Sequence, residues 1–342
     1  MTLGAPAFPL LVLFGLNAVD EFDREAASIL LPDIRDAFGL DIQGALTLTS
    51  IIGFMFFFLE IPIAHFSDRY RRTRIAAGGA ALWGVFAVFS GLAPTVWLYA
   101  VARAGASSGR AVNQGTHPSL LADYYPVDTR PGVFALHRSA SQIGQFIGPL
   151  AAGLIAFWMG WRWAFILLAL PTYVFVLFAL RLREPVRGAQ ERRLMGADRE
   201  TVMTEEAPAS LAEAWRIVWQ VRTIRRVCVA IPFITIPAVA LAPLLQLFYQ
   251  EELGLNSAER GLLAAVTEPF QFVGLFVGIP LASRMMRRDP ARVTLYLAGA
   301  AALQVASLMV LVLTRNLPVV VVMRAVLALA TSSTLPVLIA TL

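Results

Sequence analysis

Long apolar stretches, separated by short polar connections, follow one another through most of the chain. A stretch of about 20 apolar residues is long enough to cross the ~30 Å hydrocarbon core of a bilayer as a helix. A helix is the expected form because it pairs its own backbone polar groups, which find no water in lipid. The pattern predicts ten membrane-spanning helices, at residues 8–31, 45–64, 75–92, 96–122, 133–158, 162–181, 228–250, 260–283, 292–313 and 317–341.

A repeated phrase indicates that the chain has two related halves. IPIAHFSDRYRR (61–72) and IPLASRMMRR (279–288) each follow an apolar segment of helix length. An internal repeat in a hydrophobic chain is typical of membrane folds built from two similar halves, as in many secondary transporters. We therefore expect an all-α integral membrane bundle with two pseudo-symmetric halves, residues 1–182 and 228–342.

The connection between these halves, residues 183–227, is long and polar. Near its end, Leu211, Trp215, Val218 and Trp219 recur at helical spacing. This pattern predicts a short amphipathic helix. It would either lie on the membrane face or simply bridge the two halves.

Composition supports a membrane protein and disfavours several other classes. Hydrophobic residues make up 58% of the chain and charged residues 15%, whereas soluble domains carry about 25% charge. All 28 basic side chains are arginines, and they concentrate in the connections after the second, sixth and eighth predicted spans. By the positive-inside rule, this places the N-terminus in the cytoplasm and the protein in the inner (plasma) membrane. Nucleic-acid binding is disfavoured, because the arginines fall in short loops with no recognition motif.

The chain offers no sign of an enzyme or a bound cofactor. Cys228 is the single cysteine, which excludes an internal disulfide and a cysteine metal cluster. The sequence contains no H-E-x-x-H and no nucleotide-binding loop. We expect no metal, no cofactor and no enzymatic activity.

Several motifs in order resemble one family of transporters. After the second predicted span come a small residue, an Asp-Arg pair and a basic cluster, here Ala64, Asp68, Arg69, Arg71 and Arg72. GQFIGPLAAG (144–153) follows in the fifth span, and GWRWAF (160–165) leads into the sixth. Together these resemble the major facilitator superfamily, whose glycine-proline motif in the fifth helix is often seen in proton-driven exporters.

The first span and the exit from the sixth are similar to the spinster-like branch of that superfamily. Asn17, Asp23, Arg24, Leu31, Pro32 and Asp33 follow its layout, as does LREPVRG (182–188). The resemblance implies twelve spans, so about ten of an expected twelve are present and the second half is two helices short. The chain is then either part of a longer protein or a ten-span variant, and a fused ATP-binding cassette domain is one conceivable continuation.

The first span contains Asp20, Glu21, Asp23, Arg24 and Glu25. Ionisable groups in a membrane are costly and mark function. Helical spacing places Asn17, Arg24 and either Asp20 or Glu21 on one face. These groups either form a proton-binding site that faces a central cavity, or lie in water beyond a helix that ends near Val19.

The fourth span contains Arg103 and Arg110, seven residues apart and so on one helix face. A buried arginine needs an acid, and we predict that Arg103 or Arg110 pairs with an acid of the first span. By the resemblance, an arginine in the fourth helix is linked to proton coupling; alternatively it only holds helices together. The candidate coupling residues are Asp20, Glu21, Asp23, Arg103 and Arg110.

The remaining candidates concern solute binding, gating and packing. The solute cavity is predicted to include Asn17, Arg24, Asn113, Gln142, Glu268 and Gln271. Glu268 is equally consistent with a structural pair with Arg324. The resemblance implies a gate at Asp68, Arg69 and Arg72, although these arginines also fit a purely topological role. Close helix packing is expected at Gly144, Gly148, Pro149 and Gly153. His117 and His137 are weaker candidates for a proton role.

Two functions follow from these patterns. The first is a monomeric, proton-coupled secondary transporter that exports small amphipathic or lipid-like organic solutes by alternating access. Its partners would be the solute, protons and the lipid bilayer. The second is a membrane module of an ATP-driven transport assembly, or a membrane sensor.

Overall fold

The computed structural model describes residues 6–198, 201, 211–288 and 291–341, and every regular element in that part is helical. Long helices occupy all ten predicted spans, and one of them is broken in two. They are α1 (Ala7–Ile29), α3 (Ile42–Arg69), α4 (Arg72–Leu92), α5 (Val96–Tyr124), α6 (Arg130–Met159), α7 (Trp161–Ala179), α11 (Arg222–Glu251), α12 (Ser257–Thr267) with α13 (Pro269–Arg288), α14 (Ala291–Leu313) and α15 (Leu317–Thr341).

Shorter helices lie in the connections: α2 (Leu31–Phe38), η1 (Val127–Thr129), α8 (Ala189–Leu194) and α10 (Leu211–Gln220). By length and composition alone, six helices of the described part are suited to cross a membrane, or seven if the bent pair Leu31–Phe38 and Ile42–Met55 counts as one span. Helix α1 is not among the six, because it carries the ionisable residues between Asp20 and Glu25.

Local chemistry sets the ends of several helices. The Asp41 carboxylate accepts a hydrogen bond from the Gly44 N–H at 2.7 Å and so caps the start of α3. Asn256 and Glu259 form a capping box at the start of α12. Gly160 adopts a φ of +88° between α6 and α7, where a side chain would be strained.

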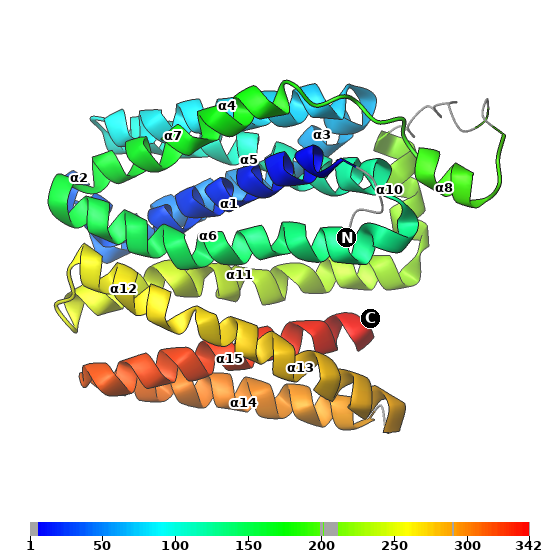
Figure 1. The fold of residues 1–342 in the computed structure, drawn as a ribbon. Helices are drawn as coiled ribbons and strands as arrows, with labels where there is room; N and C mark the ends of the chain where they lie inside the picture. Colours follow the sequence, from blue (N-terminus) through cyan, green and yellow to red (C-terminus); the bar gives the residue numbers. More distant parts are fainter. Residues whose placement is uncertain (1–5, 199–200, 202–210, 289–290, 342) are drawn as a thin grey trace.

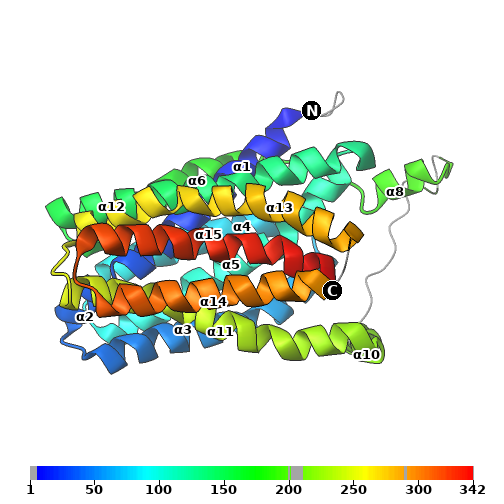
Figure 2. The same cartoon turned by 90° about the horizontal axis from the view of Figure 1, so that it is seen from below.

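The helices run side by side in two groups (Figure 1). In the first group α1 packs on α6 and α7, and α4 packs on α5 and α7. In the second, α15 packs on α13 and α14, which Figure 2 shows from below. The groups meet where α6 contacts α12 and where α11 contacts α1, α2 and α3. We call the end of the bundle with α2 the α2 end, and the end with α8 and α10 the linker end (Figure 1).

Two apolar clusters lie in the first group, one toward each end of α1. Leu13 and Leu16 belong to the cluster toward the linker end, and Ala26 and Ile29 to the cluster toward the α2 end. The charged segment of α1 lies between them, so its ionisable side chains are placed in the middle of the bundle and not in water beyond a helix end.

Candidate functional site

Ion pairs join the charged segment of α1 to α5. Arg103 Nη1 lies 2.8 Å from Asp23 Oδ1, and Arg110 Nη2 lies 3.0 Å from Asp23 Oδ2. Arg110 Nε also lies 2.8 Å from Asp20 Oδ1. The pairing between the first and fourth spans that the sequence predicted is therefore present, and both arginines take part in it. We call these four residues the coupling cluster, after the role that the sequence analysis predicts for them.

The coupling cluster is almost inaccessible to solvent. Asp20, Asp23 and Arg103 are 5%, 2% and 4% exposed. Arg103 also lies over the Phe165 ring, with its Cζ 5.2 Å from the ring centroid. Charges in such a place are tolerated only when they are paired and hydrogen-bonded, and loss of one partner typically costs about 3–5 kcal/mol. Protonation of one carboxylate would remove such a partner without a mutation.

A second set of charges on α1 faces away from this cluster. Arg24 Nε lies 2.8 Å from Glu21 Oε2, and Arg24 Nη2 lies 3.2 Å from Glu25 Oε1. Asp20 thus faces α5 together with Asp23, and Arg24 turns to the other side with Glu21. Of the two acids that helical spacing allowed on the face of Arg24, Asp20 or Glu21, the structure selects Glu21. At about 100° per residue, Arg24 lies angularly between the two sets, and ion pairing with its own helix neighbours decides its direction.

Arg24 is half exposed, with 50% of its side chain accessible, although its helix is otherwise packed in the bundle. An exposed charge in a spanning helix requires water or polar partners. Glu268 lies close enough to Arg24 and Glu25 for their charges to interact. This brings the charged segment of α1 near the second half of the chain.

Glu268 stands at the break between α12 and α13, directly before Pro269. Arg324 Nη2 of α15 lies 3.1 Å from Glu268 Oε1, and the Gln271 amide donates to the same carboxylate. The structural pair with Arg324 is therefore present. Glu268 stays a candidate for the predicted solute site, because broken helices near the middle of a membrane are where transporters bind their cargo.

The glycines of α6 make close contacts on two sides. A Cβ added at Gly144 would lie 2.4 Å from Glu21 Cβ, so this glycine lets α1 approach. A Cβ at Gly153 would lie 2.4 Å from the Ser257 carbonyl oxygen and 3.1 Å from Gly261 Cα of α12. Gly148 likewise faces α1, and the Pro149 carbonyl faces Gly261. The glycine-proline motif thus packs α6 on the first helix and on the second half.

Charged side chains tie the two halves together at the α2 end. Arg260 of α12 donates to the Asp33 carboxylate of α2. Arg35 Nη1 lies 2.5 Å from Glu251 Oε1 of α11, and the Gln250 amide donates to Asp36 at 2.7 Å. The sequence indicated Asp33 only as part of the family layout and did not reveal its partner. We call the Asp33–Arg260 and Arg35–Glu251 pairs the α2-end lock.

At the linker end, Arg72 lies in a buried network of its own. It is 2% exposed, and its guanidinium lies 2.5 Å from Asp123 Oδ2 and 3.0 Å from Glu184 Oε1. Asp123 is on α5 of the first half, and Glu184 lies at the start of the connection that follows α7. In this structure Arg72 is therefore a clamp that joins α4, α5 and the start of the connection, and its gate role stays a prediction.

The LREPVRG segment supplies the rest of that clamp. Glu184 Oε2 accepts hydrogen bonds from the backbone N–H and the hydroxyl of Thr73, at 2.9 and 2.8 Å, and so caps the start of α4. Arg187 donates to the Tyr70 carbonyl at 2.9 Å, at the end of α3. Burial acts to raise the pKa of Glu184, but hydrogen bonds from Thr73 and Arg72 outweigh burial and hold that pKa below its usual 4.5.

The remaining residues predicted for the gate and the solute cavity lie apart from the coupling cluster or at its edge. Arg69 is exposed at the end of α3, and the side chain of Asp68 lies outside the part that the structure describes. Asn17 of α1 donates to the His137 carbonyl and to Ser141 Oγ of α6, both at 2.9 Å. Asn113 is buried and Gln142 is half-buried.

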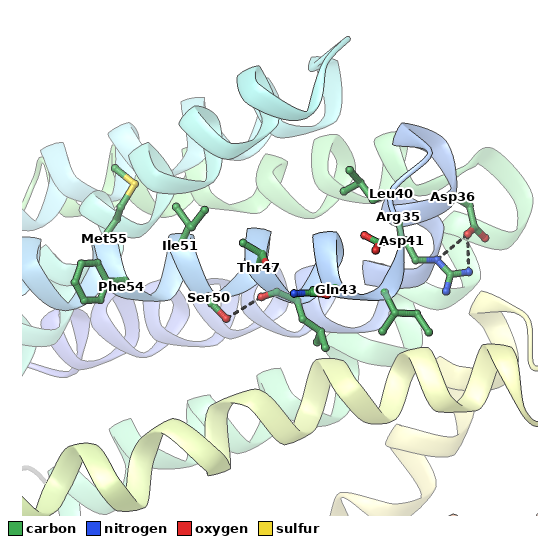
Figure 3. A pocket seen from close by; sticks show the side chains of 12 residues that line it. Arg35, Asp36, Leu40, Asp41, Gln43, Thr47, Ser50, Ile51, Phe54 and Met55 are labelled. Carbon is green, nitrogen blue, oxygen red and sulfur yellow. Dashed lines mark hydrogen bonds and ion pairs between the residues drawn. The ribbon is translucent and has the colours of Figure 1, made fainter.

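A groove of about 1080 Å³ runs along α3, a feature that the sequence did not indicate. Arg35, Asp36 and Asp41 lie at its α2 end, and apolar side chains such as Ile51, Phe54 and Met55 continue it along the helix (Figure 3). A charged end and an apolar wall suit an amphipathic molecule.

Comparison with known proteins places this geometry in a family. A family model described as Major Facilitator Superfamily matches residues 13–342. The chain belongs to the major facilitator superfamily. Membership indicates a multi-pass membrane transporter and not an enzyme.

Individual relatives agree with this placement. "Protein spinster homolog 1" of Homo sapiens is 28% identical over 193 residues, which cover 55% of this chain and 37% of the relative. "Lincomycin resistance protein" of Streptomyces lincolnensis is 31% identical over 176 residues, covering 51% of this chain and 36% of the relative. "Probable L-galactonate transporter" of Escherichia coli (strain K12) is 25% identical over 276 residues, covering 78% and 59%. The matches thus cover less than two thirds of each relative.

Solved structures show the same fold. A bacterial homolog of the human lysosomal transporter spinster, in an inward-facing and unoccupied conformation, has a TM-score of 0.74 at 21% identity. The match covers 97% of this chain and 74% of that one. Together with the sequence relatives, it confirms the resemblance to the spinster-like branch of the superfamily.

Proposed function

We propose that this chain is a proton-coupled secondary transporter of small amphipathic or lipid-like organic solutes. It works as a monomer in the inner (plasma) membrane, with its N-terminus in the cytoplasm, by alternating access and in the direction of export. The observation that carries the proposal is the buried coupling cluster of Asp20, Asp23, Arg103 and Arg110.

Charge balance supports proton binding in the middle of the bundle. Asp20, Glu21, Asp23 and Glu25 contribute four acids, whereas Arg24, Arg103 and Arg110 contribute three arginines. One carboxylate is in excess, and it lies in the set of Glu21, Glu25 and Arg24. Within the balanced coupling cluster, burial favours the uncharged form of an acid, and most of all of the acid with fewer partners. Asp23 has two arginine partners and Asp20 has one. We therefore assign proton binding to Asp20. Asp23 stays ionised and keeps its ion pairs with Arg103 and Arg110.

Protonation of Asp20 would then change the conformational equilibrium. Neutral Asp20 no longer holds Arg110, which keeps Asp23 as its ion-pair partner. A ligand shifts an equilibrium between two conformations only by its difference in affinity for them. Loss of the Asp20–Arg110 ion pair on protonation gives the proton a different affinity for the two conformations.

The proposed path of the solute lies between the two halves, where Arg24 and Glu268 approach one another. The α2-end lock supports a conformation that is closed at this end. With the N-terminus inside, that conformation is inward-facing, like that of the solved bacterial spinster homolog. The name of the Streptomyces relative supports export of drug-like compounds, and the groove along α3 supports an amphipathic solute.

The experiment is substrate-induced proton movement in proteoliposomes, with a panel of lysophospholipids and cationic amphiphilic drugs including lincomycin. We expect a change of internal pH with one class of solute and none in liposomes without protein. Silence across the panel from folded, oriented protein would contradict the proposal. It would favour the membrane module of an ATP-driven assembly or a sensor instead.

A further inference from the structure

Two buried histidines meet inside the first half. His117 Nδ1 of α5 lies 3.2 Å from His137 Nε2 of α6, and the two residues are 2% and 8% exposed. At this distance one imidazole N–H donates a hydrogen bond to the nitrogen of the other ring. The pair can therefore pass a proton between its rings. The chain has three histidines, and the third, His65, is partly exposed on α3.

Polar groups connect the pair with the coupling cluster. Arg110, Asn113 and His117 follow at spacings of three and four residues, so they share one face of α5. On α1, Asn17 is one turn before Asp20, and its amide donates to the His137 carbonyl and Ser141 Oγ. The line from Arg110 to His117 covers about 10 Å of helix and leads toward the linker end.

Some polar side-chain atoms on this line have no hydrogen-bond partner within the described part of the chain. They are both amide atoms of Asn113 and the Nε2 atom of His117. The two residues are only 4% and 2% exposed. A buried polar group that stays unpaired costs about 1–3 kcal/mol. Such groups in native proteins are almost always met by protein or by ordered water. The segment between Asp20 and His117 is therefore suited to hold water.

We propose that the His117–His137 pair, with Asn113 and water, forms a proton path between Asp20 and the linker end. This inference rests on the proposed proton coupling. Each ring accepts a proton on one nitrogen and releases one from the other, so it stays neutral and ends in the opposite tautomer. A hydronium ion at the linker end supplies the proton and becomes water, and the Asp20 carboxylate becomes a carboxylic acid. The rings regain their first tautomer before the next passage.

Charged groups lie on the helices that pack around the path, and Arg138 is close enough to His137 for the two to interact. They are Asp20 on α1, Arg72 on α4, Arg110 and Asp123 on α5, and Arg138 on α6. Arg72 and Asp123 are paired with each other, and Asp20 with Arg110. Asp20 is thus the acceptor at one end of the path.

The test follows proton uptake by the purified protein after a pH jump, with a pH-indicator dye and no solute. Wild type should show a slow phase that Asp20→Asn removes. We expect His117→Gln and His137→Gln to slow this phase about tenfold, equivalent to about 1.4 kcal/mol of barrier, with its amplitude kept. Asn113→Leu should slow it as well, whereas His65→Gln should match wild type.

An unchanged rate in the folded histidine variants would overturn the path while leaving proton coupling in place. If wild type lacks a phase that Asp20→Asn removes, the assignment of the proton to Asp20 fails whatever the histidines do. If neither histidine variant folds, Asn113→Leu decides, and loss of folding in all three variants would assign the pair to packing and overturn the inference.

Discussion

Arg260 of α12 donates to the carboxylate of Asp33 in α2 and so ties the second half of the chain to the first. Arg260 is 1% exposed, and its Nη1 also donates to the Leu255 carbonyl at 3.1 Å. Its charge is therefore held in place and has Asp33 as its acid partner. Arg35–Glu251 and the close contact of Gly153 with Gly261 also join the two halves at the α2 end.

Asp33→Asn should increase the population that is open at the α2 end. The change keeps the shape of the side chain but leaves the buried Arg260 guanidinium without a negative partner, which is costly. A loss of about 1.4 kcal/mol corresponds to a tenfold shift in the equilibrium. We expect about that increase in the labelling rate of Gln271→Cys by a membrane-impermeant thiol reagent, in a Cys228→Ser background. Asp128→Asn, an exposed acid at the linker end, is the control. Equal rates for Asp33→Asn and this control would contradict the lock.

Gly153→Ala should push α6 and α12 apart. The new Cβ would lie 2.4 Å from the Ser257 backbone oxygen, which cannot rotate away as a side chain does. Added volume in a tight contact typically costs about 1–3 kcal/mol. We expect a lower melting temperature and faster labelling of the Gln271→Cys probe. Gly78→Ala is the matched control, because a Cβ at Gly78 meets nothing within 4 Å. A Gly153→Ala variant as stable and as slowly labelled as the control would contradict the close contact.

Helical spacing predicted the contacts of the coupling cluster but not the α2-end lock. Arg103 and Arg110 share a face of one apolar helix, and buried arginines require acids, which α1 supplies. Asp33 and Arg260 are 227 positions apart. No periodicity links them, and their meeting depends on how the two halves pack. Spacing likewise left open whether Asp20 or Glu21 shares the face of Arg24, because it gives the angle between side chains and not the side on which neighbouring helices lie.

The linker-end clamp shows a similar limit. LREPVRG was recognised only as a family-like exit from the sixth helix, and its sequence does not reveal that Glu184 caps α4. Arg72 belongs to a basic cluster whose other members suit a topological signal. Its burial follows from the presence of Asp123 and Glu184 around it, which no local pattern of the cluster indicates.

Glu184→Gln should destabilise the protein at neutral pH by about 1–3 kcal/mol, because it weakens hydrogen bonds to a charged acceptor. The pKa of Glu184 in the folded protein is held below its usual 4.5. Its contribution to stability is therefore fully present above about pH 4.5 and is lost as the pH falls through the lower, folded-state pKa. The difference in melting temperature between wild type and Glu184→Gln should be large at pH 7 and shrink in acid. A difference that does not depend on pH would contradict this role, and Asp128→Asn again serves as the control.

The central claim is that the coupling cluster links proton binding to transport. Its most direct test compares pH-driven transport with proton-independent solute exchange in proteoliposomes containing wild type, Asp20→Asn or Asp23→Asn. Asp20→Asn should abolish pH-driven transport and keep exchange, because it mimics the protonated acid. Asp23→Asn should impair both and lower the melting temperature, because Arg103 and Arg110 lose their shared partner. Undiminished pH-driven transport in folded Asp20→Asn protein would contradict the account.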